Sequence, residues 1–135
     1  MTLKTYRGSC HCGLIAYEAD LDLTHGTAKC NCSFCLKARA WKAFIKPAAF
    51  CLLRGEDAAV GYQAHPQASR KFFCRRCGVR THELGCADYL GGDFVGIFVA
   101  SLDDATAAEL AAAPVRYADG RDNNWRSPPA ETGHL

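Results

Sequence analysis

The chain has 135 residues, a length typical of one domain, and its sixteen basic and fourteen acidic residues give a formal net charge of +2. This near-balance argues against binding of nucleic acid or a membrane surface through overall charge. Residues 1–6 contain no apolar run of signal-peptide length, and no segment approaches the ~20 apolar residues that a membrane span requires. We therefore expect a cytoplasmic protein, in which nine cysteines indicate metal binding rather than a disulfide framework.

Short segments rich in β-forming residues, separated by turn residues, predict a mainly β, antiparallel fold. In chain order the expected strands are 14–19, 43–46, 50–53, 60–62, 70–73, 79–84 and 94–100. Segments 43–46 and 50–53 flank Pro47 and predict a hairpin or meander, whereas 60–62 and 70–73 predict an antiparallel pair. The apolar run 94–100 is too short for a buried helix and predicts the central strand.

One short helix is expected. Residues 101–104 resemble a capping box, and the alanine-rich stretch 105–113 ends at Pro114. Residues 119–135 are polar and contain proline, so we expect an irregular C-terminal tail that only Trp125 can hold in place. The whole chain, 1–135, is interpreted as a single domain.

Seven of the nine cysteines fall into three tight groups: Cys10 and Cys12; Cys30, Cys32 and Cys35; Cys74 and Cys77. The two pairs together supply the four thiolates of a closed structural zinc site. The triplet then holds a second zinc whose fourth position stays open, which is the pattern of a reactive site. Glycine follows each pair, at Gly13 and Gly78, where a tight metal-binding turn tolerates positive φ. The expected content is two zinc ions per chain.

Cys51 and Cys86 lie outside these groups, and we expect both to be buried as small apolar side chains. If either is a fourth ligand to the triplet zinc, the open position is lost, and Cys86 in its loop is the better candidate. His11 lies between two ligand cysteines, where the alternation of an extended chain predicts that it faces solvent.

Three motifs resemble the family of glutathione-dependent formaldehyde-activating enzymes and centromere protein V. They are Gly8-Ser9-Cys10-His11-Cys12-Gly13, Cys30-Asn31-Cys32-Ser33-Phe34-Cys35 and Phe73-Cys74-Arg75-Arg76-Cys77-Gly78. The resemblance extends over nearly the whole chain, and it implies a small zinc-stapled domain of the β-tent type. It also implies that the outer pairs form the structural site and the triplet the catalytic one. The implied activity is that of a carbon–sulfur lyase, which forms or cleaves a thiol–aldehyde adduct such as S-hydroxymethylglutathione.

A zinc ion held by three thiolates carries a formal charge of about −1 and is a weak Lewis acid, so strong activation of water is not expected. It can instead take a substrate thiol as fourth ligand and keep it as thiolate, which adds to an aldehyde carbon. His25, His82 and Glu83 are candidate proton donors by residue type. Lys37, Arg39 and Lys42 follow the triplet and are candidates for binding the carboxylates of a thiol such as glutathione.

Two other functions stay open at this point. The basic run of Arg70, Lys71, Arg75, Arg76 and Arg80 invites a nucleic-acid interpretation. We disfavour it because these residues surround a negatively charged cysteine site, and the chain lacks the interleaved aromatic platforms that single-strand binders use. The first alternative function is therefore a non-catalytic zinc module that binds protein or nucleic acid. The second is a thiol or redox sensor, in which the triplet loses zinc and forms a disulfide on oxidation.

Overall fold

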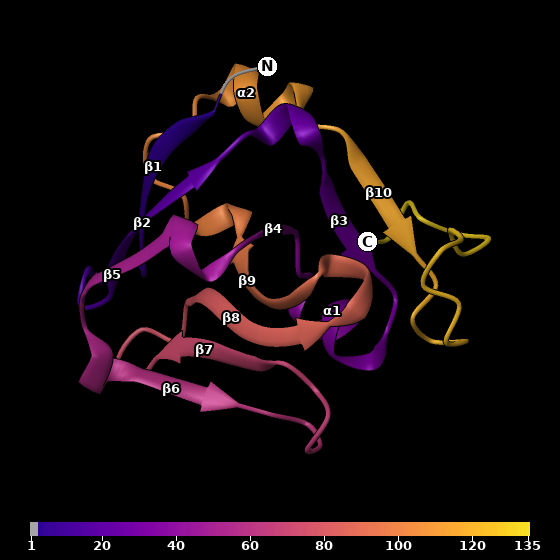
Figure 1. Cartoon of the computed structure of the whole chain (residues 1–135), viewed down its shortest axis with the longest axis horizontal. Coiled ribbons are helices and arrows are strands. Elements are labelled where there is room, and N and C mark those ends of the chain that lie inside the picture. The colour runs from indigo at the N-terminus through magenta and orange to yellow at the C-terminus, as the bar shows by residue number, and fades with distance from the viewer. Residues whose placement is uncertain (1–2) are drawn as a thin grey trace.

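The computed structural model describes residues 3–135; residues 1 and 2 of the expected domain lie outside this range. The described residues form one mainly β domain of two sheets (Figure 1). The smaller sheet has the order β1 (Lys4–Ser9), β2 (Ala16–Leu21) and β5 (Phe50–Arg54). The larger sheet has the order β10 (Val115–Ala118), β3 (Thr27–Cys30), β4 (Lys42–Ile45), β9 (Gly92–Phe98), β8 (Arg80–Ala87), β7 (Arg70–Cys74) and β6 (Ala59–Tyr62). No helix in this part of the chain is long and apolar enough to cross a membrane.

The central strand is the one that the apolar run predicted. Strand β9 pairs antiparallel with β4 on one side and with β8 on the other, and residues 94–98 are all buried. The antiparallel pair predicted from 60–62 and 70–73 is also confirmed, with Ala59 opposite Cys74 and Tyr62 opposite Lys71. The hydrophobic pattern therefore located both the buried central strand and a largely unburied pair at the edge of the larger sheet.

The predicted hairpin of 43–46 and 50–53 is wrong. Strand β4 pairs with β3 and β9, whereas β5 pairs with β2 in the other sheet. A single 3₁₀ turn at Pro47–Ala49 separates the two strands and carries the chain from one sheet to the other. Strands β1, β3 and β10 were not predicted, and β10 runs parallel to β3. A local pattern does not say which sheet a strand joins.

Residues 3–135 contain two short α-helices where one was expected. The predicted helix is confirmed as α2 (Ala107–Ala112), but its capping box is formed by Thr106 and Glu109 rather than by residues 101–104. The other helix, α1 (Ser33–Ala38), lies in the cysteine triplet that was interpreted as a loop. Two turns of helix are too short to show a hydrophobic period, which explains the omission.

Aromatic side chains fill the space between the two sheets around His82. The His82 ring stacks on Phe72 at 4.8 Å and lies 4.9 Å from the ring of Phe50, with Tyr17 at 6.4 Å. Its Nδ1 pairs with Thr81 Oγ1 at 2.9 Å. Burial lowers the pKa of His82 to about 4, so the ring stays neutral at neutral pH.

This buried histidine predicts a loss of stability in mild acid. The unfolded chain binds a proton at His82 below about pH 6.5, but the folded chain does so only below about 4. The contribution of neutral His82 to the free energy of unfolding is therefore fully present above pH 6.5. It decreases as the pH drops, by about 2.5 kcal/mol at pH 4.5. Urea unfolding at pH 7 and 4.5 in excess zinc should show a smaller acid loss for His82→Phe than for wild type. His65→Phe, at an exposed histidine, should keep the wild-type loss; equal losses in all three proteins would contradict the prediction.

Candidate functional site

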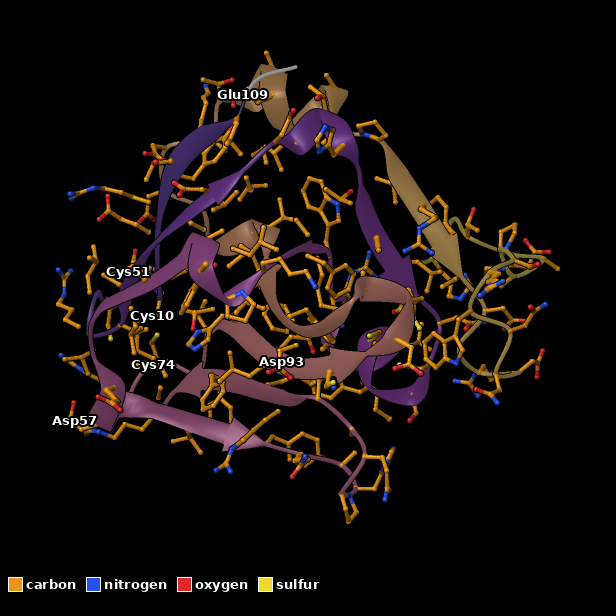
Figure 2. All side chains as sticks on the ribbon, viewed as in Figure 1. Cys10, Cys51, Asp57, Cys74, Asp93 and Glu109 are labelled. Carbon is orange, nitrogen blue, oxygen red and sulfur yellow. The ribbon has the colours of Figure 1, made fainter. Side chains whose placement is uncertain are left out.

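Four cysteines from distant turns meet in one cluster. Cys10 and Cys12 lie in the turn between β1 and β2, Cys74 ends β7, and Cys77 lies in the turn before β8. Their sulfur atoms all lie within 4.8 Å of one another, with Cys12 Sγ 3.8 Å from Cys10 Sγ and 3.6 Å from Cys74 Sγ. Figure 2 shows Cys10 close to Cys74, where the smaller sheet approaches β7. A tetrahedral zinc with bonds of about 2.3 Å separates its sulfurs by roughly 3.8 Å, so the four cysteines fit this metal.

The backbone around this cluster forms tight turns and directs N–H groups at the sulfurs. Gly13 and Gly78 have φ values of +82° and +77°, as the turn prediction required. The N–H groups of Ile15 and Arg76 point at cluster sulfurs over 3.3 and 3.4 Å. These dipoles stabilise negative charge on sulfur, which a four-thiolate site accumulates.

Without metal, the pKa values of Cys12 and Cys77 in this cluster are shifted in opposite directions. The backbone N–H of Leu14 lowers the pKa of Cys12, but burial and the neighbouring thiols outweigh it and raise this pKa to about 11. Burial raises the pKa of Cys77, but the backbone N–H groups of Val79 and Cys12 outweigh it and lower this pKa to about 6. A metal that binds all four sulfurs must displace the remaining protons, so its affinity rises with pH.

The cysteine triplet forms a second cluster at the start of α1. Cys30 ends β3, Cys32 caps the helix through a 3.4 Å hydrogen bond from Cys35 N, and Cys35 is buried in the first turn. Cys32 N also donates to Cys30 Sγ at 3.2 Å. The three sulfurs lie within 4.8 Å of one another and can hold a metal. The predicted loop is therefore wrong, because the first turn of α1 brings Cys32 and Cys35 close together.

Interactions among these sulfurs shift the pKa values of Cys32 and Cys35 in opposite directions. Hydrogen bonds from the Cys30 and Cys35 thiols, together with the positive charge of Lys42, lower the pKa of Cys32 to about 2 despite burial. Contacts with the Cys30 and Cys32 sulfurs raise the pKa of Cys35. The lowered pKa favours the thiolate form of Cys32, which is the form of cysteine that binds metal ions.

The triplet opens into a cavity of about 480 Å³. Its walls are partly aromatic, with Phe34, Phe44, Phe94, Tyr89 and Trp125 among the lining residues. Its charged lining residues include Lys42, Lys71, Glu83 and Arg116. The volume lies within the ~300–1,000 Å³ range of small-molecule pockets. A ligand in this cavity reaches the three sulfurs.

A buried ion-pair network lies beside the triplet. Lys42 Nζ is 2.8 Å from one carboxylate oxygen of Glu83, and Lys71 Nζ is 3.7 Å from the other, which also accepts from Ser69 Oγ at 2.6 Å. Burial disfavours the charge on Lys42, but Glu83 and the triplet sulfurs outweigh it and raise the pKa of Lys42. Lys42 therefore keeps a positive charge next to the thiolates.

Some of the candidate substrate-binding and proton-donor residues line the triplet cavity, and others lie elsewhere in the domain. Lys42 and Glu83 line the triplet cavity, while Lys37 is exposed on α1 and lines a neighbouring cavity. Arg39 ends α1, and its Nη1 donates to His134 O at 3.3 Å. Of the three candidate proton donors, only Glu83 lines this cavity. His82 packs among aromatic rings, and the exposed His25 pairs with Asp22 at 3.5 Å.

The prediction that Cys51 and Cys86 are buried is wrong, because both are exposed. Cys51 lies on β5, where it is opposite Glu18 and alternates with half-buried Leu52. Cys86 lies near the end of β8 and lines the triplet cavity without belonging to either cluster. A hydrogen bond to Asp93 raises the pKa of Cys86, so its thiol stays protonated. His11 is exposed, as predicted.

The C-terminal tail folds back onto the triplet, which sequence reasoning did not foresee. Asn31, between two triplet cysteines, donates to Asp119 Oδ1 at 2.9 Å and accepts from Arg121 N at 3.0 Å. Trp125 Nε1 donates to Asn123 Oδ1 at 2.7 Å, and the Trp125 side chain lines the triplet cavity. The tail is irregular, as predicted, and follows β10 (Figure 1). Its residues Gly120 and Trp125 line the triplet cavity.

Gly120 allows this close approach. A Cβ at this position would lie 2.6 Å from both Cys30 Sγ and the Trp125 ring. Overpacking of this kind costs about 1–3 kcal/mol, so Gly120→Ala should displace the tail or Cys30 and weaken zinc retention at the triplet by roughly tenfold. Competition with a chromophoric chelator measures this affinity. Gly133→Ala, in open space in the same tail, should match wild type; equal affinities in both variants would contradict the role of Gly120.

The fold and the two clusters define a class of protein: a small mainly β domain with a four-cysteine and a three-cysteine group, each of which could hold a metal ion. Residues 5–117 match the family described as glutathione-dependent formaldehyde-activating enzyme. The chain belongs to this family. It is also similar to the crystal structure of a Rhodobacter sphaeroides protein, with 28% sequence identity and a TM-score of 0.67 over 82% of this chain and 99% of that one.

Proposed function

We propose that this chain is a zinc-dependent carbon–sulfur lyase that forms or cleaves a thiol–aldehyde adduct, with glutathione and formaldehyde as the reference pair. The observation that carries the proposal is the three-sulfur cluster at the base of a ligand-sized cavity, in a chain of the formaldehyde-activating family. Cys30, Cys32 and Cys35 would hold the zinc, which would bind a substrate sulfur beside them and favour its thiolate form.

The reaction balances without an oxidant or reductant. The thiol sulfur forms a bond to the carbonyl carbon, the carbonyl π electrons move to oxygen, and the thiol proton ends on that oxygen to give a hemithioacetal. The reverse direction breaks the C–S bond and returns the aldehyde and the thiol. The protein has to bind both reactants close together, allow one proton to reach the carbonyl oxygen, and stabilise the transient negative charge on that oxygen.

The chain's own residues suit these tasks. Trp125, Phe44 and Phe94 exclude water from part of the cavity. The ammonium of Lys42, fixed by Glu83, places positive charge beside the sulfurs, where it can stabilise the negative charge that develops on a substrate oxygen. Lys37 and Arg39 remain proposed carboxylate-binding residues, although Arg39 is engaged by the tail.

The reaction is tested by exchange NMR. Glutathione and ¹³C-formaldehyde form their adduct spontaneously, and zinc-loaded protein should accelerate the exchange between free and bound formaldehyde. Boiled protein and zinc alone are the controls. The proposal fails if several low-molecular thiols show no acceleration. Loss of the triplet zinc under mild peroxide together with absent exchange would instead favour a redox sensor.

A further inference from the structure

A second cavity of about 500 Å³ lies next to the triplet cavity. It is formed between α1 and the face of β6, β7 and β8, and its lining residues are Ser33, Phe34, Lys37, Ala38, Tyr62, Ala64, Lys71, Phe73 and Arg80. Four of these, Ser33, Phe34, Ala64 and Lys71, also line the triplet cavity. The two cavities are therefore neighbouring parts of one site, joined at Phe34, which precedes the ligand Cys35.

The second cavity is positively charged. Lys37, Lys71 and Arg80 line it, and no acidic residue does. Lys71 shares the buried carboxylate of Glu83 with Lys42, so its charge is partly balanced. Lys37 and Arg80 form no ion pair with any residue in the range 3–135. Two uncompensated cations in a concave surface attract an anionic group.

The ring of Phe34 contacts two of the three cations that line this cavity, Arg80 and Lys71. Arg80 lies over the Phe34 ring at 5.3 Å from its centroid, and Lys71 Nζ lies at 4.9 Å. Tyr62 stacks on the same ring at 5.9 Å with an interplanar angle of 19°. A guanidinium fixed by a ring keeps its planar fork of N–H donors free for a carboxylate. The ordering of Arg80 precedes ligand binding, which reduces the entropy lost on binding.

We infer that this second cavity, centred on Phe34 and Arg80, is the subsite for a carboxylate-bearing arm of the substrate thiol. The inference rests on the proposed function, because it assumes that the substrate sulfur occupies the triplet. A peptide-like thiol fits this arrangement: its sulfur lies at Cys30, Cys32 and Cys35, its chain passes Phe34, and a carboxylate pairs with Arg80 and Lys37. The basic residues of β7 and β8 thereby select an anionic small molecule.

Binding without turnover tests the subsite. S-methylglutathione has the carboxylates of glutathione but no thiol, and it is titrated into zinc-loaded protein by calorimetry or NMR. A charge-assisted bond contributes about 1.5–3 kcal/mol, so Arg80→Gln should raise Kd by about tenfold or more. Lys37→Gln, on an exposed side chain, should raise Kd by a smaller factor. Arg75→Gln, at an exposed arginine outside both cavities, should stay within twofold of wild type.

The ligand provides a second control. The dimethyl ester of S-methylglutathione lacks both carboxylates and should bind wild type and Arg80→Gln alike. The subsite is overturned if this ester binds wild type as tightly as the free acid, or if neither Arg80→Gln nor Lys37→Gln changes Kd. It is also overturned if a single-stranded oligonucleotide displaces S-methylglutathione in an Arg80-dependent way, because the cavity then serves phosphates.

This experiment separates the two proposals. A protein that binds S-methylglutathione through Arg80 but does not accelerate formaldehyde exchange upholds the subsite and overturns the lyase reaction. A protein that accelerates exchange, and whose Kd for S-methylglutathione is unchanged by Arg80→Gln and Lys37→Gln, upholds the reaction and overturns the subsite. Thermal unfolding and zinc content of each variant show that the fold and both metal clusters are intact.

Discussion

Replacing Cys74 by serine should unfold the domain. The Cys74 side chain is buried in the four-cysteine cluster, which ties the β1–β2 turn of the small sheet to the β7–β8 turn of the large one. Structural zinc contributes about 10–16 kcal/mol in zinc-finger peptides, comparable to the about 5–15 kcal/mol that stabilises a whole domain. Removing one of four sulfurs therefore removes most of the net stability.

Circular dichroism and zinc content measure this result. We expect Cys74→Ser to lose its cooperative thermal transition and both zinc ions, because the triplet also depends on the folded sheets. Cys51→Ser is the matched control, since Cys51 is exposed and belongs to neither cluster. A Cys74→Ser protein that melts cooperatively within a few degrees of wild type would show that packing alone holds the two sheets together.

Replacing Cys32 by serine should abolish activity and leave the fold intact. Cys32 caps the short helix α1 at the edge of the domain, and the four-cysteine cluster is built from other turns. We expect the zinc content to fall from two per chain to one. Exchange of formaldehyde should slow by at least about a hundredfold, because loss of even an outer partner of a metal ligand costs about 10–100-fold.

Cys86→Ser provides the control for this variant. Cys86 lines the same cavity, but its thiol lies outside the triplet. Two zinc ions and wild-type exchange are expected for Cys86→Ser. Loss of one zinc in this variant would make Cys86 the fourth ligand and remove the open position on which the proposed reaction depends. Retention of two zinc ions in Cys32→Ser would likewise contradict the assigned ligand set.

Features encoded by neighbouring residues could be predicted from the sequence. The apolar run 94–100 indicated the central strand, and the glycines after each cysteine pair indicated the metal-binding turns. The division of seven cysteines into four and three anticipated both clusters, because zinc prefers four ligands and the two pairs together supply four sulfurs.

Features that depend on distant partners could not be predicted. Whether Cys51 faces solvent depends on which sheet β5 joins, and the tail reaches the triplet only because Asn31 and Gly120 meet in the folded chain. The charged neighbours of the triplet, Lys42 and Glu83, come from different strands.

The sequence by itself therefore determined the family, the strand-rich composition and the identity of both cysteine clusters. Only the tertiary structure decided what surrounds the triplet: the Lys42–Glu83 pair, the wall made by Trp125, and the basic cavity at Phe34 and Arg80. The physical reason is that ligand type and spacing are local properties of a chain. Burial, charge and the shape of a cavity arise from contacts between segments far apart in it.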